Sequence, residues 1–115
     1  MIREAGDMVK EIKERFRGGE GSVEITHMFQ KEELTGKARL CAKLTLNPGS
    51  TIGLHEHSNE EEIFYIIKGK GLAFDNGVTR EVKAGDAILT VGGTSHSVNN
   101  TGDEPLELLA VILLY

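Results

Sequence analysis

Short stretches in which apolar and polar residues alternate follow one another along most of the chain from residue 22 onward. Alternation puts every second side chain on the same face of a β-strand, so each stretch predicts a strand that buries one face. The pattern is clearest over residues 22–29 and 37–46. Further strands are expected at residues 63–67, 72–75, 78–82, 87–91, 96–98 and 106–115.

The first residues follow a different period. Apolar residues recur there at helical spacing, between charged ones, as Met8, Ile12 and Phe16. Asp7 is a suitable N-cap, and Gly18 suits the left-handed conformation in which many helices end. The sequence therefore predicts a short amphipathic N-terminal helix over residues 7–17.

Composition narrows the class of protein. The chain has 115 residues, which is the size of one domain, and 14 glycines, which suit an all-β barrel with many turns. The Asn76-Gly77 pair predicts a two-residue hairpin turn. A net charge of −5 argues against a nucleic-acid partner. The single cysteine, Cys41, has no second cysteine with which to form an internal disulfide.

The sequence shows neither a signal peptide nor a membrane span. The N-terminus lacks an apolar signal core, and the longest apolar run, residues 108–115, is too short to cross a bilayer. We therefore expect a cytoplasmic protein with no membrane partner.

A pair of histidines carries the strongest chemical signal. His55 and His57 are two residues apart, so in a strand their side chains point to the same side and converge on one point. A neutral imidazole nitrogen is a good ligand for transition metals. Three glutamates at residues 60–62 follow a short turn, and one of them is a candidate carboxylate ligand. Alternation does not show which, because both faces of residues 63–67 are apolar.

His27 is the other histidine of interest, because it shares the apolar face of its expected strand with Val23, Ile25 and Phe29. One interpretation is a half-buried histidine bonded to the backbone. The other is a catalytic residue at the rim of a pocket, where it would shuttle protons or contact substrate.

Two motifs in order resemble those of the cupin superfamily. Residues 49–69 contain a glycine, His-x-His, a glutamate and a second glycine, spaced as in the first cupin motif: Gly49, His55, His57, Glu62 and Gly69. Residues 85–100 match the second motif at four positions: Gly85, Gly93, His96 and Asn100. Val91 departs from the pattern, because the family usually has proline there.

The resemblance implies a cupin-type double-stranded β-helix, or jelly-roll barrel, in one domain over residues 1–115 with its core at about residues 22–115. It also implies one divalent metal ion and selects Glu62 among the three glutamates. The implied ligands are His55, His57, Glu62 and His96. Manganese, iron, nickel and zinc all suit this mixture of imidazole and carboxylate.

Three neutral histidines and one glutamate leave a divalent ion with residual positive charge, which favours anionic oxygen ligands. We expect a metal-dependent enzyme of the dioxygenase or decarboxylase type, acting on a small anionic or enolic oxygenated substrate. The alternatives are a non-catalytic binding or sensor protein and a sugar or keto-acid isomerase. No arginine lies within either motif to hold a carboxylate, which favours chemistry that depends on the metal.

Two of the expected strands are apolar on both faces, residues 63–67 and 106–115. One face can line the barrel, and the other needs a cover. The N-terminal helix would supply part of that cover, and a second subunit the rest. The sequence therefore predicts a homodimer that forms through the outer face of the sheet.

Overall fold

The computed structural model describes all 115 residues and consists of strands joined by short turns. The strands are β1 (Val9–Glu14), β2 (Ser22–Phe29), β3 (Ala38–Leu46), β4 (Thr51–Glu56), β5 (Glu60–Lys68), β6 (Lys70–Asp75), β7 (Val78–Lys83), β8 (Ala87–Thr90), β9 (Ser95–Asn100) and β10 (Leu106–Leu114). Three single 3-10 turns complete the structure: η1 (Ala5–Asp7), η2 (Phe16–Gly18) and η3 (Lys31–Glu33). The prediction of an all-β fold is confirmed.

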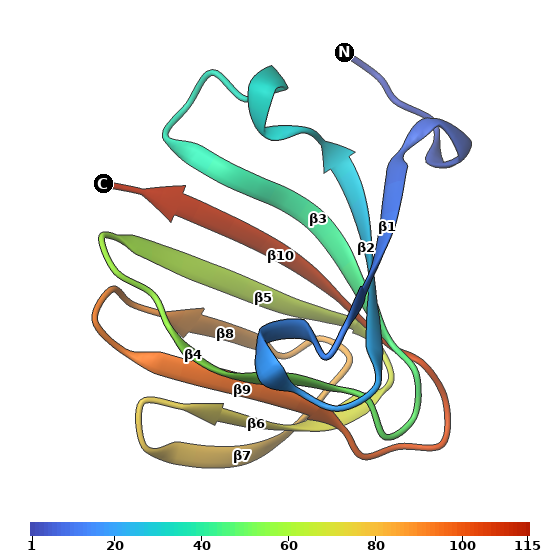
Figure 1. Ribbon diagram of the computed structural model, residues 1–115, viewed down its shortest axis with the longest axis vertical. Coiled ribbons are helices and arrows are strands. Elements are labelled where there is room, and N and C mark those ends of the chain that lie inside the picture. Colours follow the sequence, from blue (N-terminus) through green and yellow to red (C-terminus); the bar gives the residue numbers. More distant parts are fainter.

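The strands form two antiparallel sheets (Figure 1). One has six strands in the order β1-β2-β3-β10-β5-β8, and the other has four in the order β4-β9-β6-β7. β4 and β5 are consecutive in the chain but belong to different sheets. The link between them therefore carries the chain, and the histidine-rich motif with it, from one sheet to the other.

The core lies between the sheets and follows the alternation of the sequence. In β10, which runs between β3 and β5, every second residue from Leu106 to Ile112 is buried. In β3, Ala42, Leu44 and Leu46 are buried in the same way. Burial of apolar area contributes about 25 cal/mol per Å², so these inward faces stabilise the fold by removing apolar surface from water.

The predicted helix over residues 7–17 is wrong. Residues 9–14 form β1, which pairs with β2 in continuous register from Val9 opposite His27 to Glu14 opposite Ser22. A helix of this length is marginal in water, whereas the open edge of β2 offers β1 a full ladder of hydrogen bonds. All six residues of β1 are exposed, so the apolar spacing there marks no buried helix face.

The predicted hairpin turn at Asn76-Gly77 is confirmed. These two residues link β6 to β7, with Asp75 directly opposite Val78. Both have positive φ, 46° and 84°, as a type I′ turn requires.

None of the helical segments is long and apolar enough to cross a membrane.

Candidate metal centre

The structure brings together the four residues that the motifs single out: His55, His57, Glu62 and His96. His55 lies near the end of β4 and is paired in register with His96 on β9 of the same sheet. His57 follows just beyond β4, and Glu62 lies on β5 of the other sheet. One potential ligand atom from each residue lies within 4.8 Å of all the others. The group therefore sits between the two sheets.

His96 lies at the centre of this group. Its Nε2 atom is 3.0 Å from the Nε2 atoms of both His55 and His57 and 3.0 Å from Glu62 Oε1. The His57 Nε2 atom is also 3.0 Å from Glu62 Oε1. His57, Glu62 and His96 are buried, and His55 is half-buried. Four polar atoms thus surround one small space that is largely closed to solvent.

Hydrogen bonds on the far side of the rings orient two of the histidines. His55 Nδ1 lies 2.7 Å from the carbonyl oxygen of Gly53, and His57 Nδ1 lies 2.5 Å from Glu60 Oε2. Both partners only accept hydrogen bonds, so each Nδ1 carries the proton. Arg39 holds Glu60 in place with two hydrogen bonds of 2.8 and 2.7 Å. In the neutral rings, both Nε2 atoms then carry lone pairs.

Two linked hydrogen bonds orient the ring of His96. The Thr90 hydroxyl donates to Asp75 Oδ1 at 2.6 Å and lies 2.7 Å from His96 Nδ1. Since its one proton is committed to Asp75, the hydroxyl accepts a hydrogen bond from Nδ1–H of His96. Phe64 stacks on the imidazole with 4.9 Å between ring centroids. The His96 Nε2 atom therefore also presents a lone pair to the centre.

This donor set fits a divalent metal ion. Three lone-pair nitrogens and a carboxylate oxygen at such short range repel one another unless positive charge lies between them. Metal–ligand bonds of about 2.1 Å held at right angles would place neighbouring donor atoms about 3.0 Å apart. The observed separations of 3.0 Å agree with that arrangement.

The surroundings shift the pKa values of the two paired histidines in opposite directions. Burial is the main cause that lowers the pKa of His55 to about 4. A hydrogen bond to Glu62 raises the pKa of His57, and the Glu60 carboxylate acts in the same direction. The Arg39 guanidinium lowers the pKa of Glu60 to about 2, so that carboxylate is charged at neutral pH. These neighbours therefore favour the protonated form of His57 and the neutral form of His55.

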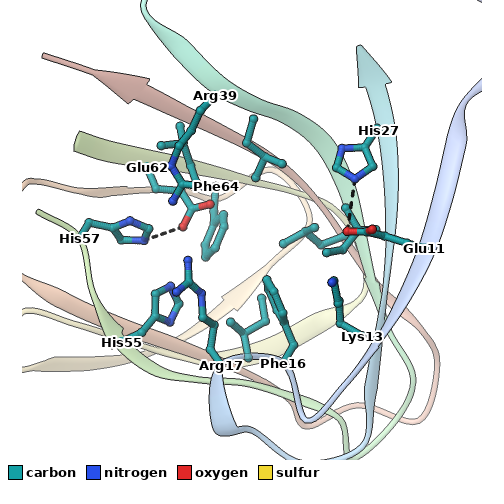
Figure 2. A pocket seen from close by; sticks show the side chains of 15 residues that line it. Glu11, Lys13, Phe16, Arg17, His27, Arg39, His55, His57, Glu62 and Phe64 are labelled. Atoms are coloured by element: carbon teal, nitrogen blue, oxygen red, sulfur yellow. Dashed lines mark ion pairs between the residues drawn. The ribbon is translucent and has the colours of Figure 1, made fainter. Parts of the chain in front are cut away.

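A cavity of about 280 Å³ opens beside the histidines (Figure 2). Its apolar wall comes mainly from the six-stranded sheet, including Leu40 and Phe64, and from Phe16 of η2. Arg17 and Arg39 also line it, although both lie outside the two motifs. Neither motif contains an arginine, but folding brings these two to the pocket. No spacing in the sequence signals this, because Arg39 is placed there by the pairing of β3 within its sheet and Arg17 by the packing of η2 against β4.

His27 lies in the same pocket, away from the metal-binding group. It faces Glu11 of β1, with 3.5 Å between His27 Nε2 and Glu11 Oε1. Figure 2 shows this pair on the opposite side of the pocket from His55 and His57. The structure thus places His27 at a pocket wall with a carboxylate partner. A catalytic role for it stays a prediction.

Comparison with known proteins decides the family. Residues 42–112, more than half of the chain, match the family described as Cupin domain. The chain belongs to the cupin family. This cupin is 46% identical over 114 residues to the oxalate-binding protein of Thermotoga maritima, an alignment that covers 99% of this chain and 94% of that protein.

Solved structures agree with this assignment. A crystal structure described as a predicted oxalate decarboxylase from Thermotoga maritima superposes on this cupin with a TM-score of 0.95 at 46% identity, covering 100% of both chains. The cupin domain of Cnp3 from Schizosaccharomyces pombe has a TM-score of 0.74 at 14% identity, covering 91% of this chain and 69% of that one. The second likeness shows the fold alone.

Proposed function

We propose that this cupin holds a divalent metal ion and captures on it a small dicarboxylate of the oxalate class. The observation that carries the proposal is the arrangement of the four ligand atoms. Three Nε2 lone pairs and one carboxylate oxygen meet at one end of the pocket, and outer hydrogen bonds fix each histidine tautomer. Such outer contacts orient and tune the ligands of metal sites in general.

The charge of the pocket supports an anionic ligand. A divalent ion bound by Glu62 and three neutral histidines would retain about one positive charge. Two cationic residues of the pocket wall, Lys13 and Arg17, form no ion pair with an acidic residue. Metal and wall together favour a ligand with more than one negative charge.

The size of the pocket and the known relatives point to a small dicarboxylate. A cavity of about 280 Å³ is slightly smaller than the roughly 300–1,000 Å³ of typical small-molecule sites, so it suits a very small ligand. The Thermotoga maritima relative, which shares 46% of its aligned residues with this chain, is named for binding oxalate. Oxalate carries two carboxylates and is among the smallest molecules that match both the size and the charge of this site.

Calorimetric titration tests the proposal directly. Protein purified without nickel affinity resin and stripped of metal would be loaded with manganese(II), then titrated with oxalate. We expect oxalate to bind the loaded protein and the metal-free protein to show no binding. Glu62→Gln, which keeps the side-chain size but removes the charge, should lose both metal and oxalate. Equal binding of oxalate by the metal-free protein would contradict the proposal.

A second candidate function is turnover of the bound acid, as in a decarboxylase or a dioxygenase. The His27–Glu11 pair in the same pocket favours it, because loss of carbon dioxide from a carboxylate leaves a carbon that must receive a proton. The test measures formate release and oxygen uptake by the manganese and iron forms. His27→Asn should abolish turnover while oxalate binding persists. If wild-type protein binds oxalate without consuming it, a binding function remains.

A further inference from the structure

We propose that Arg17 recognises the outward-facing oxygens of the metal-bound acid, and that it makes this cupin select dicarboxylates over monocarboxylates. The inference rests on the proposed function, since it assigns the residue that sets the specificity of the same site. Arg17 belongs to η2, the short turn between β1 and β2, and lies outside both cupin motifs.

Arg17 lies in the pocket and is free to bind a ligand. It lines the cavity together with His55, His57 and Glu62. Figure 2 shows its side chain extending from η2 past the ring of His55 into the pocket. No carboxylate lies within ion-pair distance of it, whereas the other arginine of the pocket, Arg39, is fully engaged by Glu60.

The backbone of the turn fixes the direction of Arg17. The residue has φ 56° and ψ 31°, the left-handed conformation that residues other than glycine seldom adopt. Backbone hydrogen bonds close the turn around it, from Gly18 N to Arg15 O at 2.8 Å and from Gly19 N to Phe16 O at 3.0 Å. The guanidinium lies over the Phe16 ring, 5.9 Å from its centroid. Uncommon backbone conformations held by surrounding contacts are frequent at ligand sites.

Close contact between two glycines holds η2 against β4 and so fixes the backbone of Arg17 next to the histidines. A Cβ atom on Gly53 would overlap the carbonyl oxygen of Arg17 and would lie 2.7 Å from the backbone nitrogen of Gly19. Gly53 is also the residue whose carbonyl accepts the hydrogen bond from His55 Nδ1. The same residue thus touches the turn that carries Arg17 and orients a metal ligand.

The chemistry of the guanidinium matches a dicarboxylate. An arginine side chain presents N–H donors in a planar fork that binds two neighbouring oxygens at once. Oxalate that contacts a metal through one oxygen of each carboxylate still presents its other two oxygens outward. Acetate has no second carboxylate to present. Arg17 would therefore stabilise bound oxalate and contribute little to bound acetate.

Lys13 is the other unpaired cation of the pocket wall, but its position differs. Figure 2 shows Lys13 on the side of the pocket near Glu11, while Arg17 lies beside His55. The Lys13 ammonium is also a point charge without a planar fork. Both observations assign the recognition of a small metal-bound acid to Arg17.

The experiment compares Arg17→Gln with Arg15→Gln in manganese-loaded protein. Arg15 is a matched control, because it lies in the same turn with φ 50° and the same charge but does not line the pocket. Titrations would use oxalate, malonate and acetate, with manganese affinity and thermal unfolding measured for each variant. Arg17→Gln should bind manganese and acetate within about twofold of wild type and bind oxalate at least about tenfold more weakly. Arg15→Gln should bind all three acids like wild type, and Arg17→Lys should be intermediate for oxalate.

Three results would overturn the inference. The first is oxalate binding by Arg17→Gln that is as tight as in wild type. The second is an equal loss of affinity for oxalate and acetate in Arg17→Gln, which would indicate a general effect of charge. The third is a loss of oxalate affinity in Arg15→Gln as large as in Arg17→Gln, which would also indicate a general effect of charge. Failure of wild-type protein to bind oxalate in the presence of manganese is a separate outcome, because it would overturn the proposed function itself.

Discussion

At the scale of single residues, the partners of the metal-binding histidines matter as much as the histidines. Each imidazole donates its Nδ1 proton to a different acceptor: the Gly53 carbonyl, the Glu60 carboxylate or the Thr90 hydroxyl. The three Nε2 atoms are thereby directed at one point before any metal arrives. Pre-orientation of this kind lowers the entropic cost of assembling the site.

Loss of the Thr90 hydroxyl should weaken metal binding. Thr90→Val keeps the side-chain shape but leaves the buried His96 Nδ1–H and Asp75 Oδ1 without the atom that joins them. Removing an outer contact to a metal ligand typically lowers affinity about 10–100-fold. Competition with a metal-chelating dye would measure the change. Thr79→Val, at an exposed position on β7, is the control and should leave affinity unchanged. Unchanged affinity in Thr90→Val would show that the two linked hydrogen bonds do not orient His96.

The opposite pKa shifts of His55 and His57 predict how metal affinity depends on pH. Glu62 and Glu60 raise the pKa of His57, and a metal ion must displace the proton that His57 binds. As the pH is lowered, metal affinity should therefore begin to fall before pH 6.5 is reached. Below that point it should fall about tenfold per pH unit, as expected for one displaced proton. His55, with its pKa lowered to about 4, should add no second proton until near that pH.

Calorimetry in buffers with different enthalpies of ionisation counts the displaced protons. At pH 6 we expect about one proton released for each metal ion bound. Release of two or more protons at that pH would mean that His55 is protonated as well, which would contradict the effect assigned to its burial.

All four members of the metal-binding group could be predicted from the sequence, but the alternation of apolar and polar residues did not show which of the three glutamates is the ligand. Glu60 and Glu62 lie two residues apart on β5, so they share a face and the spacing treats them alike. In the structure, Glu62 reaches the histidine Nε2 atoms, and Glu60 instead binds His57 Nδ1 and Arg39. The choice depends on contacts with Arg39 of β3, with His57 and with His96 of β9, which no local pattern contains. Only the resemblance to cupin motifs selected the correct residue.

At the scale of elements, the N-terminal segment shows where the sequence pattern fails. Met8, Ile12 and Phe16 fit a helical period, yet residues 9–14 form an edge strand with every residue exposed. Such a strand buries no face, so its hydrophobic pattern does not report its conformation. Pairing with β2 determines that residues 9–14 form a strand. This segment also supplies Glu11, Lys13 and Arg17 to the pocket wall. The predicted helix therefore gave no indication that these residues line the pocket.

Widening the contact between η2 and β4 should disturb both stability and ligand binding. A Cβ atom on Gly19 would overlap the Thr51 carbonyl and lie 2.8 Å from the Gly53 nitrogen, so Gly19→Ala must push the turn away from β4. Overpacking of this kind costs about 1–3 kcal/mol, which urea unfolding would measure. Oxalate affinity should fall as well, because the backbone of Arg17 moves with the turn. Gly36→Ala is the control, since a Cβ there meets no atom within 4 Å. Equal stability of the two variants would show that the close approach is not required.

At the scale of the whole molecule, one apolar surface stays uncovered. Outward-facing residues of β5 and β8 include Tyr65, Ile67 and Leu89, with exposures of 45%, 43% and 51%. Leu109 and Val111 of β10 lie beside them, opposite Tyr65 and Ile63 in the ladder. Sequence alternation anticipated both apolar faces of these strands. The helix expected to cover part of the outer face does not exist, so the need for another cover is greater than the sequence suggested.

A second copy of the chain is the cover that we predict, through a symmetric contact between the outer faces of β5, β8 and β10. Light scattering during gel filtration should give twice the 12.6 kDa mass of the chain. Tyr65→Asp places a charge in the middle of the surface and should yield monomers, while manganese binding persists because the metal-binding group lies between the sheets. Leu54→Asp, at a residue 61% exposed on β4 of the other sheet, should stay dimeric. A wild-type monomer at high protein concentration would refute the prediction, and a dimer unaffected by Tyr65→Asp would place the interface on another surface.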